Sequence, residues 1–211
     1  MRKNIILIIL VCVMVGNIVP AFSEESRKGS SIGVHYGGAS LIGSNHGNLV
    51  GAEFMYRFKE RMAVKAEFSY ASTSSTFKTS GQYFTTTDIT SYSLFPVDFT
   101  FLYFVPLNNK FSAYFGAGGG YYSLSIKEES WEQTGNSQSQ QSTETYKLNA
   151  LAPHLCIGFE ADISKRFGIY GETKYFVAKD TLHKNTEDYF STEQDINFGG
   201  PQLKIGLRFY F

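Results

Sequence analysis

Residues 202–211 read Gln-Leu-Lys-Ile-Gly-Leu-Arg-Phe-Tyr-Phe, and this stretch decides the fold. Large apolar side chains occupy Leu203 and every second position after it up to Phe211, and Lys204 and Arg208 stand between them. A period of two is that of a β-strand, whose successive side chains point to opposite faces of a sheet. The stretch therefore predicts a strand with one apolar face and one face that carries charge.

Seven further segments with the same alternation precede it. Most of them equal or exceed the roughly 9 to 11 residues that a tilted strand needs to cross a membrane, whereas strands in soluble sheets average about 5 or 6. This pattern predicts an all-β fold, an eight-stranded antiparallel up-and-down transmembrane β-barrel. The expected strands cover residues 32–41, 49–58, 62–72, 89–104, 111–125, 146–163, 167–179 and 196–211.

The start of the chain has the order of a secretory signal. Two cations precede an apolar run over residues 5–15, and small residues follow it. We expect a signal peptide over residues 1–23, with cleavage after Ser23, and a barrel domain over residues 24–211. The alternative for the same segment is a short N-terminal membrane anchor.

Composition limits the possible function. Lys and Arg together number 19, as do Asp and Glu, so no basic excess is present to bind a nucleic-acid backbone. The mean hydropathy of −0.16 is compatible with a membrane barrel, whose strands alternate apolar and polar positions. A soluble lipocalin-type barrel is the alternative, with its apolar face inside. Cleavage would remove Cys12 and leave only Cys156, so we expect no intramolecular disulfide.

The connections between the expected strands alternate between tight turns and long polar segments. Such asymmetry is typical of outer-membrane barrels, which have periplasmic turns and extracellular loops. The polar tract 135–142 is expected to be mobile. The loops over residues 126–145 and 180–195 are acidic, and the long loops could contact a host or matrix ligand, or simply be solvated. The tight turns are 59–60, 107–110 and 164–166, the long loops are 72–88, 126–145 and 180–195, and the first outer loop, 42–48, is short.

Three stretches together resemble the small bacterial outer-membrane β-barrel family that includes OmpA-like, OmpX-like and opacity-type surface proteins. They are the glycine-rich residues 114–121, residues 167–176 and the closing residues 203–211. The resemblance covers the whole expected mature chain and implies residence in the bacterial outer membrane, among lipid and lipopolysaccharide. It also implies recognition by the barrel-assembly machinery through Phe209 and Phe211. We expect a monomer.

If the apolar face of each strand meets lipid, the other face collects charged side chains inside the barrel. A barrel of about eight strands is just wide enough for side chains to fill it, so these charges should pair with one another. We expect a structural ion-pair network that plugs the lumen; the alternative is a narrow path for ions or solutes. The expected network comprises Glu53, Arg57, Lys65, Glu67, Asp98, Glu160, Glu172, Lys174, Lys204 and Arg208.

No motif in the sequence indicates an enzyme, a cofactor or a metal site. Barrels of this size that act as lipid A deacylases use a His-x-Ser pair, and none of the four histidines stands in one. His154 is expected to form hydrogen bonds inside the barrel. The predicted role is therefore structural or surface-interactive.

The alternative function is an OmpW-like channel for small or hydrophobic solutes. Such a channel needs an apolar lumen and a lateral opening, and Leu94, Pro96 and Leu102 could point inward. Pro96 and Pro153 each remove a backbone donor within an expected strand, which implies bulges or local breaks in strand pairing.

Overall fold

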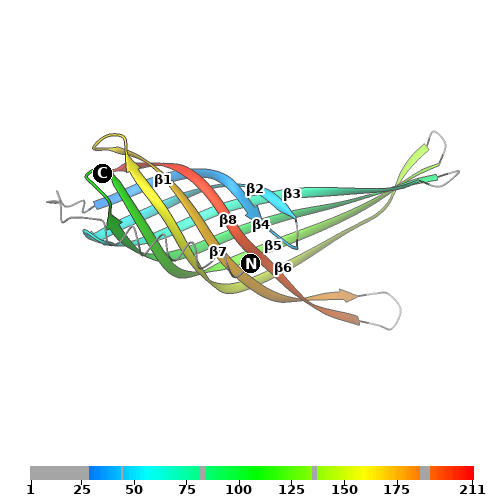
Figure 1. Ribbon diagram of the computed structural model, residues 1–211. Coiled ribbons are helices and arrows are strands. Elements are labelled where there is room, and N and C mark those ends of the chain that lie inside the picture. The colour runs from blue at the N-terminus through cyan, green and yellow to red at the C-terminus, as the bar shows by residue number, and fades with distance from the viewer. Residues whose placement is uncertain (1–28, 44, 81–83, 135–136, 186–190) are drawn as a thin grey trace, which may run out of the picture.

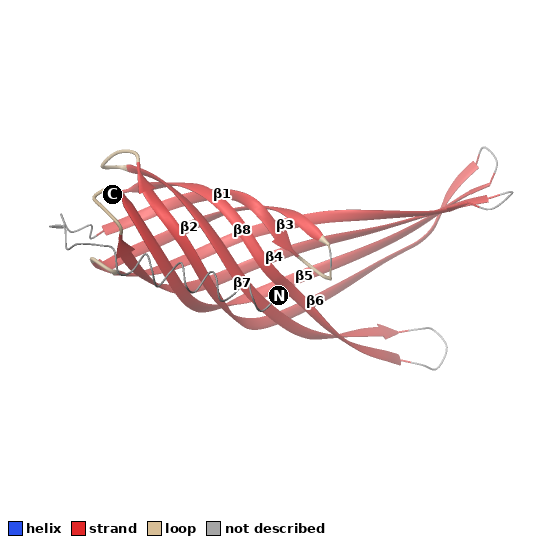
Figure 2. Ribbon diagram, viewed as in Figure 1, coloured by secondary structure: helices blue, strands red, loops and turns tan. Residues whose placement is uncertain are grey.

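In the computed structural model of the chain, residues 29–43, 45–80, 84–134, 137–185 and 191–211 are described. The expected signal peptide and its cleavage site lie outside these residues. The described chain forms eight long strands and no helix (Figures 1 and 2). The strands are β1 (Gly29–Ser40), β2 (His46–Lys59), β3 (Met62–Ser80), β4 (Phe84–Pro106), β5 (Phe111–Thr134), β6 (Ser137–Asp162), β7 (Phe167–Asn185) and β8 (Ser191–Tyr210).

Each strand pairs antiparallel with the next, and β8 returns to β1 to close the barrel. At the closing seam, Ser30 N donates to Phe211 O at 3.2 Å and Phe211 N donates to Ser30 O at 3.0 Å. Among the described residues no helix is long and apolar enough to cross a membrane. The predicted eight-stranded antiparallel barrel is thus confirmed.

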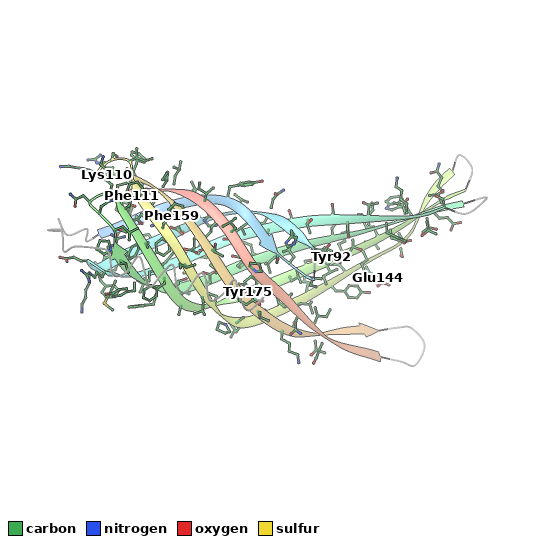
Figure 3. All side chains as sticks on the ribbon, in the orientation of Figure 1. Tyr92, Lys110, Phe111, Glu144, Phe159 and Tyr175 are labelled. Carbon is green, nitrogen blue, oxygen red and sulfur yellow. The ribbon has the colours of Figure 1, made fainter. Side chains whose placement is uncertain are left out.

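The outside of the barrel is apolar, as the alternation predicted. Phe99 and Leu155 are each 66% exposed, and Leu151 is 84% exposed. Figure 3 places Lys110 and Phe111 at the end with the tight turns, and Tyr92 and Glu144 toward the opposite end. This apolar belt includes Ile32, Val34, Val50, Phe54, Val64, Phe68, Phe95, Phe101, Phe115, Ile157, Phe159, Val177, Leu203, Ile205 and Leu207.

Three tyrosines mark the outer edge of the apolar belt. The hydroxyl groups of Tyr36 and Tyr121 donate to asparagine side chains at 3.1 and 2.8 Å, and the Tyr70 hydroxyl lies 3.2 Å from Ser93 Oγ. Tyrosine suits a membrane interface because its ring is apolar and its hydroxyl group is polar. These tyrosines indicate where the lipid-facing surface ends on this side of the barrel.

Strands β3 to β6 continue well beyond this edge as a four-stranded sheet, which we call the projecting sheet (Figure 1). It comprises residues 73–80, 85–93, 125–134 and 137–147. Pairing reaches Ser80↔Thr85, Phe84↔Thr134 and Thr134↔Ser137.

The expectation of long loops over 72–88, 126–145 and 180–195 was therefore wrong for the described residues, which are mostly strand. The Ser- and Thr-rich segments are polar on both faces, so alternation does not reveal them, but each pairs with its neighbour through backbone hydrogen bonds. The side chains at the tip of the tract 135–142 lie outside the described residues, so its expected mobility stays a prediction.

Pro153 marks the point where the barrel wall opens. Pairing between β6 and β7 runs only from Asp162↔Gly168 to His154↔Phe176. Beyond this point, away from the tight turns, β6 pairs only with β5 and β7 pairs only with β8. Proline has no N–H to donate to a ladder. The predicted break in pairing is present at this proline, without a register shift.

Pro96 interrupts pairing more locally. The β3–β4 ladder skips from Phe68↔Val97 to Ala71↔Leu94 in unchanged register, while Pro96 stays aligned with Tyr122 of β5. The break is therefore confined to one side of β4.

Strand β8 bends at the same height as the opening. Gly199 and Gly200 have φ of +102° and +136°, a region that other residues rarely adopt, and Pro201 follows them. In Figure 1 the ends of β7 and β8 that lie far from the tight turns bend away from the projecting sheet. Across the resulting split, Asn149 N donates to Asp180 Oδ2 at 2.7 Å.

Candidate functional site: the barrel lumen and its outer mouth

We call the half of the lumen nearest the tight turns the lower half and the other the upper half. The lower half contains ten buried charged residues, and they are those that alternation placed on the inner face: Glu53, Arg57, Lys65, Glu67, Asp98, Glu160, Glu172, Lys174, Lys204 and Arg208. Five are cations and five are carboxylates, so the cluster is neutral as a whole. We call it the lumen network. Strands β2, β3, β4, β6, β7 and β8 contribute its members.

Glu67 lies at the centre of the network and contacts three lysines. Its carboxylate is 3.1 Å from Lys65 Nζ and 2.9 Å from Lys174 Nζ, and it also accepts a hydrogen bond from Lys204. Lys174 extends the chain of contacts to Asp98 at 2.8 Å. Charges removed from water need such multiple partners, because a single contact does not offset their lost hydration.

Glu172 joins two of these lysines, Lys65 and Lys204. It lies directly across the β7–β8 ladder from Lys204, with 2.9 Å between the charged atoms, and 2.6 Å from Lys65 Nζ. Tyr114 of β5 adds a hydrogen bond from its hydroxyl group to Glu172 Oε2 at 3.0 Å.

Two arginines complete the network toward the end of the barrel with the tight turns. Arg208 Nε donates to Glu53 Oε1 at 3.0 Å, and its other nitrogens bind Glu53 and Glu160. Arg57 Nη2 donates to Glu160 Oε1 at 3.1 Å. The Arg57 guanidinium also lies 3.9 Å from the centre of the Phe104 ring, a cation–π distance.

Histidines at the upper edge of the network are hydrogen-bonded on both ring nitrogens. His154 contacts Thr100 Oγ1 at 2.8 Å and the Tyr122 hydroxyl at 3.1 Å, and this inward bonding agrees with the prediction. His35 lies between Ser69 Oγ and the Tyr170 hydroxyl.

Sequence reasoning missed His35, Tyr114 and Tyr170 as members of the interior. His35 and Tyr170 could have been found from the alternation of their own strands, since both occupy inward positions between outward apolar residues. The signal for Tyr114 is weaker, because it stands in a segment dominated by glycine.

Glycines of β5 make room for these inward groups. A Cβ on Gly118 would lie 2.8 Å from His154 Nε2, and one on Gly120 would lie 2.5 Å from the Asp98 Cβ, both closer than real contacts. The glycine-rich stretch thus serves close packing inside the barrel.

The upper half of the lumen is apolar. Leu94 points inward here, as expected, and Tyr122 and Phe176 stack with ring centroids 4.0 Å apart. Leu102 also points inward, but it packs in a separate cluster nearer the tight turns, with Phe104 and Tyr114. This apolar layer lies between the lumen network and the projecting sheet and beside the split between β6 and β7. Its buried members are Ala39, Leu41, Leu49, Ala71, Leu94, Tyr122, Leu124, Ile126, Leu148, Ala150, Ala152, Phe176, Ala178 and Phe198.

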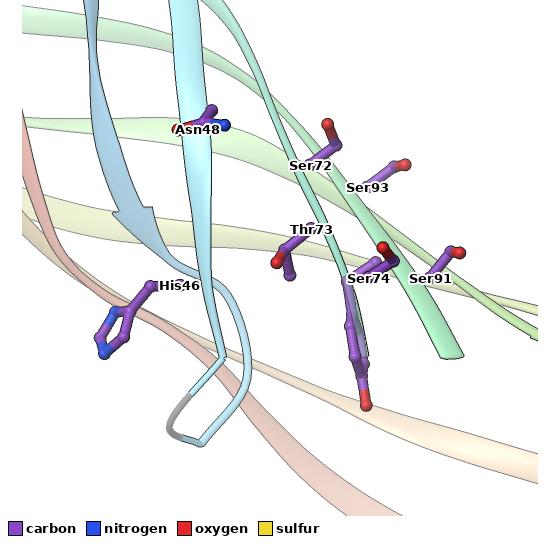
Figure 4. A pocket seen from close by; sticks show the side chains of 8 residues that line it. His46, Asn48, Ser72, Thr73, Ser74, Ser91 and Ser93 are labelled. Carbon is purple, nitrogen blue, oxygen red and sulfur yellow. The ribbon is translucent and has the colours of Figure 1, made fainter. Parts of the chain in front are cut away.

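Outside the barrel mouth, the end of β2 leaves a hollow of about 510 Å³ against β3 and β4 (Figure 4). His46, Asn48 and Tyr92 line it together with five serine and threonine residues of β3 and β4. We call it the mouth pocket. Its lining contains no Asp, Glu, Lys or Arg.

Within the part of the chain that the structure describes, no three His, Cys, Asp or Glu residues are placed to hold a metal ion. Cys156 is buried in the lower lumen as a free thiol. His35 and His154 are 4% and 3% exposed, so neither can meet a substrate in this conformation.

The family described as "Outer membrane protein beta-barrel domain" matches residues 8–211. Among solved structures, the chain is similar to OprG of Pseudomonas aeruginosa, with a TM-score of 0.60 and 14% identity over 90% of this chain and 99% of that one. It is similar to neisserial surface protein A, with a TM-score of 0.56 and 12% identity over 86% of this chain and 97% of that one. It is also similar to AlkL in lipid bilayers, with a TM-score of 0.55 and 12% identity over 91% of this chain and 94% of that one. At such identities the likeness concerns the fold. No curated protein matches the chain in sequence.

Proposed function

The chain belongs to the family of outer membrane β-barrel proteins, and we propose that it is a surface-interaction protein whose barrel serves as a closed anchor. The observation that carries this proposal is the projecting sheet. Four strands stay paired beyond the tyrosines that mark the membrane edge, so the chain forms an ordered sheet outside the membrane. A barrel that served only to strengthen the envelope would need no such extension.

The lumen network supports the closed state of the anchor. The lysine and glutamate side chains of its centre are fully buried and contact one another across the barrel axis. An ion could pass only by separating buried charge pairs. The closed ladder also offers no sheet edge to a second copy in the lower barrel, which supports a monomer. Export through the signal peptide is part of this proposal.

Recording in planar lipid bilayers tests the closed anchor. Refolded protein should give no steady current, because the network leaves no continuous aqueous path. A general porin refolded in the same detergent serves as the positive control. Stable, voltage-independent current steps from the wild-type chain would contradict the proposal.

A second candidate is favoured by one observation, the split between β6 and β7 beside the apolar layer. The backbone of residues 150–153 on β6 and 177–179 on β7 makes no ladder across it. An apolar molecule held in the upper lumen could leave through this split into the outer leaflet without crossing the lumen network. The chain would then release small hydrophobic compounds laterally.

Two neighbouring positions on β7 provide a matched test of this candidate. Ala178 is 1% exposed and faces the apolar layer, whereas Val177 is 49% exposed and faces outward. If the upper lumen carries apolar compounds, Ala178→Phe should slow the uptake of an apolar fluorescent dye severalfold, and Val177→Phe should not. Equal uptake by both variants and the wild type would exclude this route.

A further inference from the structure

The mouth pocket lies at the height where the outer leaflet meets the exterior. Asn48, Ser72 and Ser93 form one row across β2, β3 and β4, and Ser74 and Ser91 form the next row outward. The Tyr70 hydroxyl, at the membrane edge, contacts Ser93 Oγ in the first row. The pocket therefore begins directly above the lipid-facing surface.

Residues outside the pocket orient its two strongest hydrogen-bonding side chains. The Tyr36 hydroxyl donates to Asn48 Oδ1 at 3.1 Å, so the amide nitrogen of Asn48 stays available as a donor. Ser40 Oγ, at the end of β1, lies 3.1 Å from His46 Nδ1 and fixes the orientation of that ring. Side chains held in place before binding lose less entropy when a ligand arrives.

The chemistry of the lining selects a class of ligand. Hydroxyl groups both donate and accept, and the Asn48 amide donates, whereas the Tyr92 ring packs against the apolar layer on the other face of β4. A charged ligand would lose hydration here without meeting an opposite charge, so an uncharged ligand is favoured. The volume of about 510 Å³ lies within the range of roughly 300–1,000 Å³ that is usual for small-molecule sites.

We propose that the mouth pocket binds an uncharged saccharide through its hydroxyl groups. The sugar has two possible sources: the oligosaccharide of the lipopolysaccharide around the barrel, or a glycan from the environment. The inference rests on the proposed surface role only in that the pocket faces outward. It does not depend on a closed lumen.

Binding of neutral oligosaccharides to full-length protein in nanodiscs tests the proposal, since sugar-headed detergents would compete. Calorimetry should detect binding, and Asn48→Leu should weaken it about 5- to 10-fold because the amide donor is lost. Asn149→Leu is the matched control: its side chain also accepts from an interface tyrosine, Tyr121, but it lies outside the pocket. This variant should bind like the wild type.

Two arms identify the source of the sugar. Nanodiscs that contain lipopolysaccharide with its core sugars should compete with the free oligosaccharide if the source is the membrane, whereas lipid A nanodiscs should not. If neither kind of nanodisc competes while the free oligosaccharide still binds, the ligand of the pocket is a glycan from the environment. Absence of saccharide binding by the wild type, or equal losses in both variants, would overturn the proposal, and neither result bears on bilayer conductance.

Discussion

Replacing Glu67 by glutamine is expected to lower the free energy of unfolding by about 3 to 5 kcal/mol, the usual cost of breaking a buried charge pair. The substitution keeps the volume of the side chain and removes its charge. Lys65, Lys174 and Lys204 then remain buried with one carboxylate fewer among them. All three side chains are fully buried, so bulk solvent cannot compensate for the lost charge.

Urea titration of refolded protein, followed by the mobility of unheated samples on gels, measures this effect. The folded barrel migrates as a compact form, and the Glu67→Gln variant should lose that form at much lower urea. Glu60→Gln, in the exposed turn between β2 and β3, is the control and should change stability by less than about 0.5 kcal/mol. Similar midpoints for both variants would mean that the central contacts contribute little.

Replacing Phe211 by alanine is expected to deplete the protein from the outer membrane of living cells while leaving the purified barrel nearly intact. The Phe211 ring is 64% exposed and stacks on Phe209 at 6.2 Å between centroids. The backbone hydrogen bonds between Phe211 and Ser30 do not need the ring. We propose that the assembly machinery recognises the Phe211 ring together with Phe209, and that the folded barrel does not need the Phe211 ring for packing.

Comparison of two measurements separates recognition from stability. Refolding yield in detergent should stay close to wild type for Phe211→Ala, whereas the amount assembled in cells should fall strongly. Phe167→Ala removes a ring of similar exposure, 52%, which also contacts Phe209 at 5.2 Å, and should assemble normally. Equal depletion of both variants would assign the effect to the aromatic surface at that end of the barrel.

The strand faces could be predicted because each barrel position has one of two environments. An inward position meets the lumen and an outward one meets lipid, so the period of two in residues 202–211 separates Lys204 from Leu203 without further information. The same rule placed Glu67 and Glu172 inside. It did not predict that Glu67 would contact three lysines, because those contacts cross the lumen and depend on the register of every strand between them.

The projecting sheet escaped prediction for a different reason. Its Ser- and Thr-rich strands bury no face, so their order comes from backbone pairing with β4 and β5 rather than from a hydrophobic pattern. The mouth pocket exists because β2 begins only at His46, while its partner β3 continues past that level to Ser80. The alternation of apolar and polar residues within one strand does not predict how long that strand is relative to its neighbour.

The equal number of cations and carboxylates in the lumen network restricts how this chain can change over evolutionary time. A substitution that neutralises one member leaves an uncompensated charge, so drift inside the barrel should proceed through compensating exchanges on different strands, such as β3 with β7 or β7 with β8. Charged residues of the projecting sheet stay closer to water, as in the pair Lys127 and Glu129, whose side chains are 49% and 25% exposed, so a lost partner there leaves no buried charge. Within one chain, the interior should therefore covary while the exterior diversifies position by position.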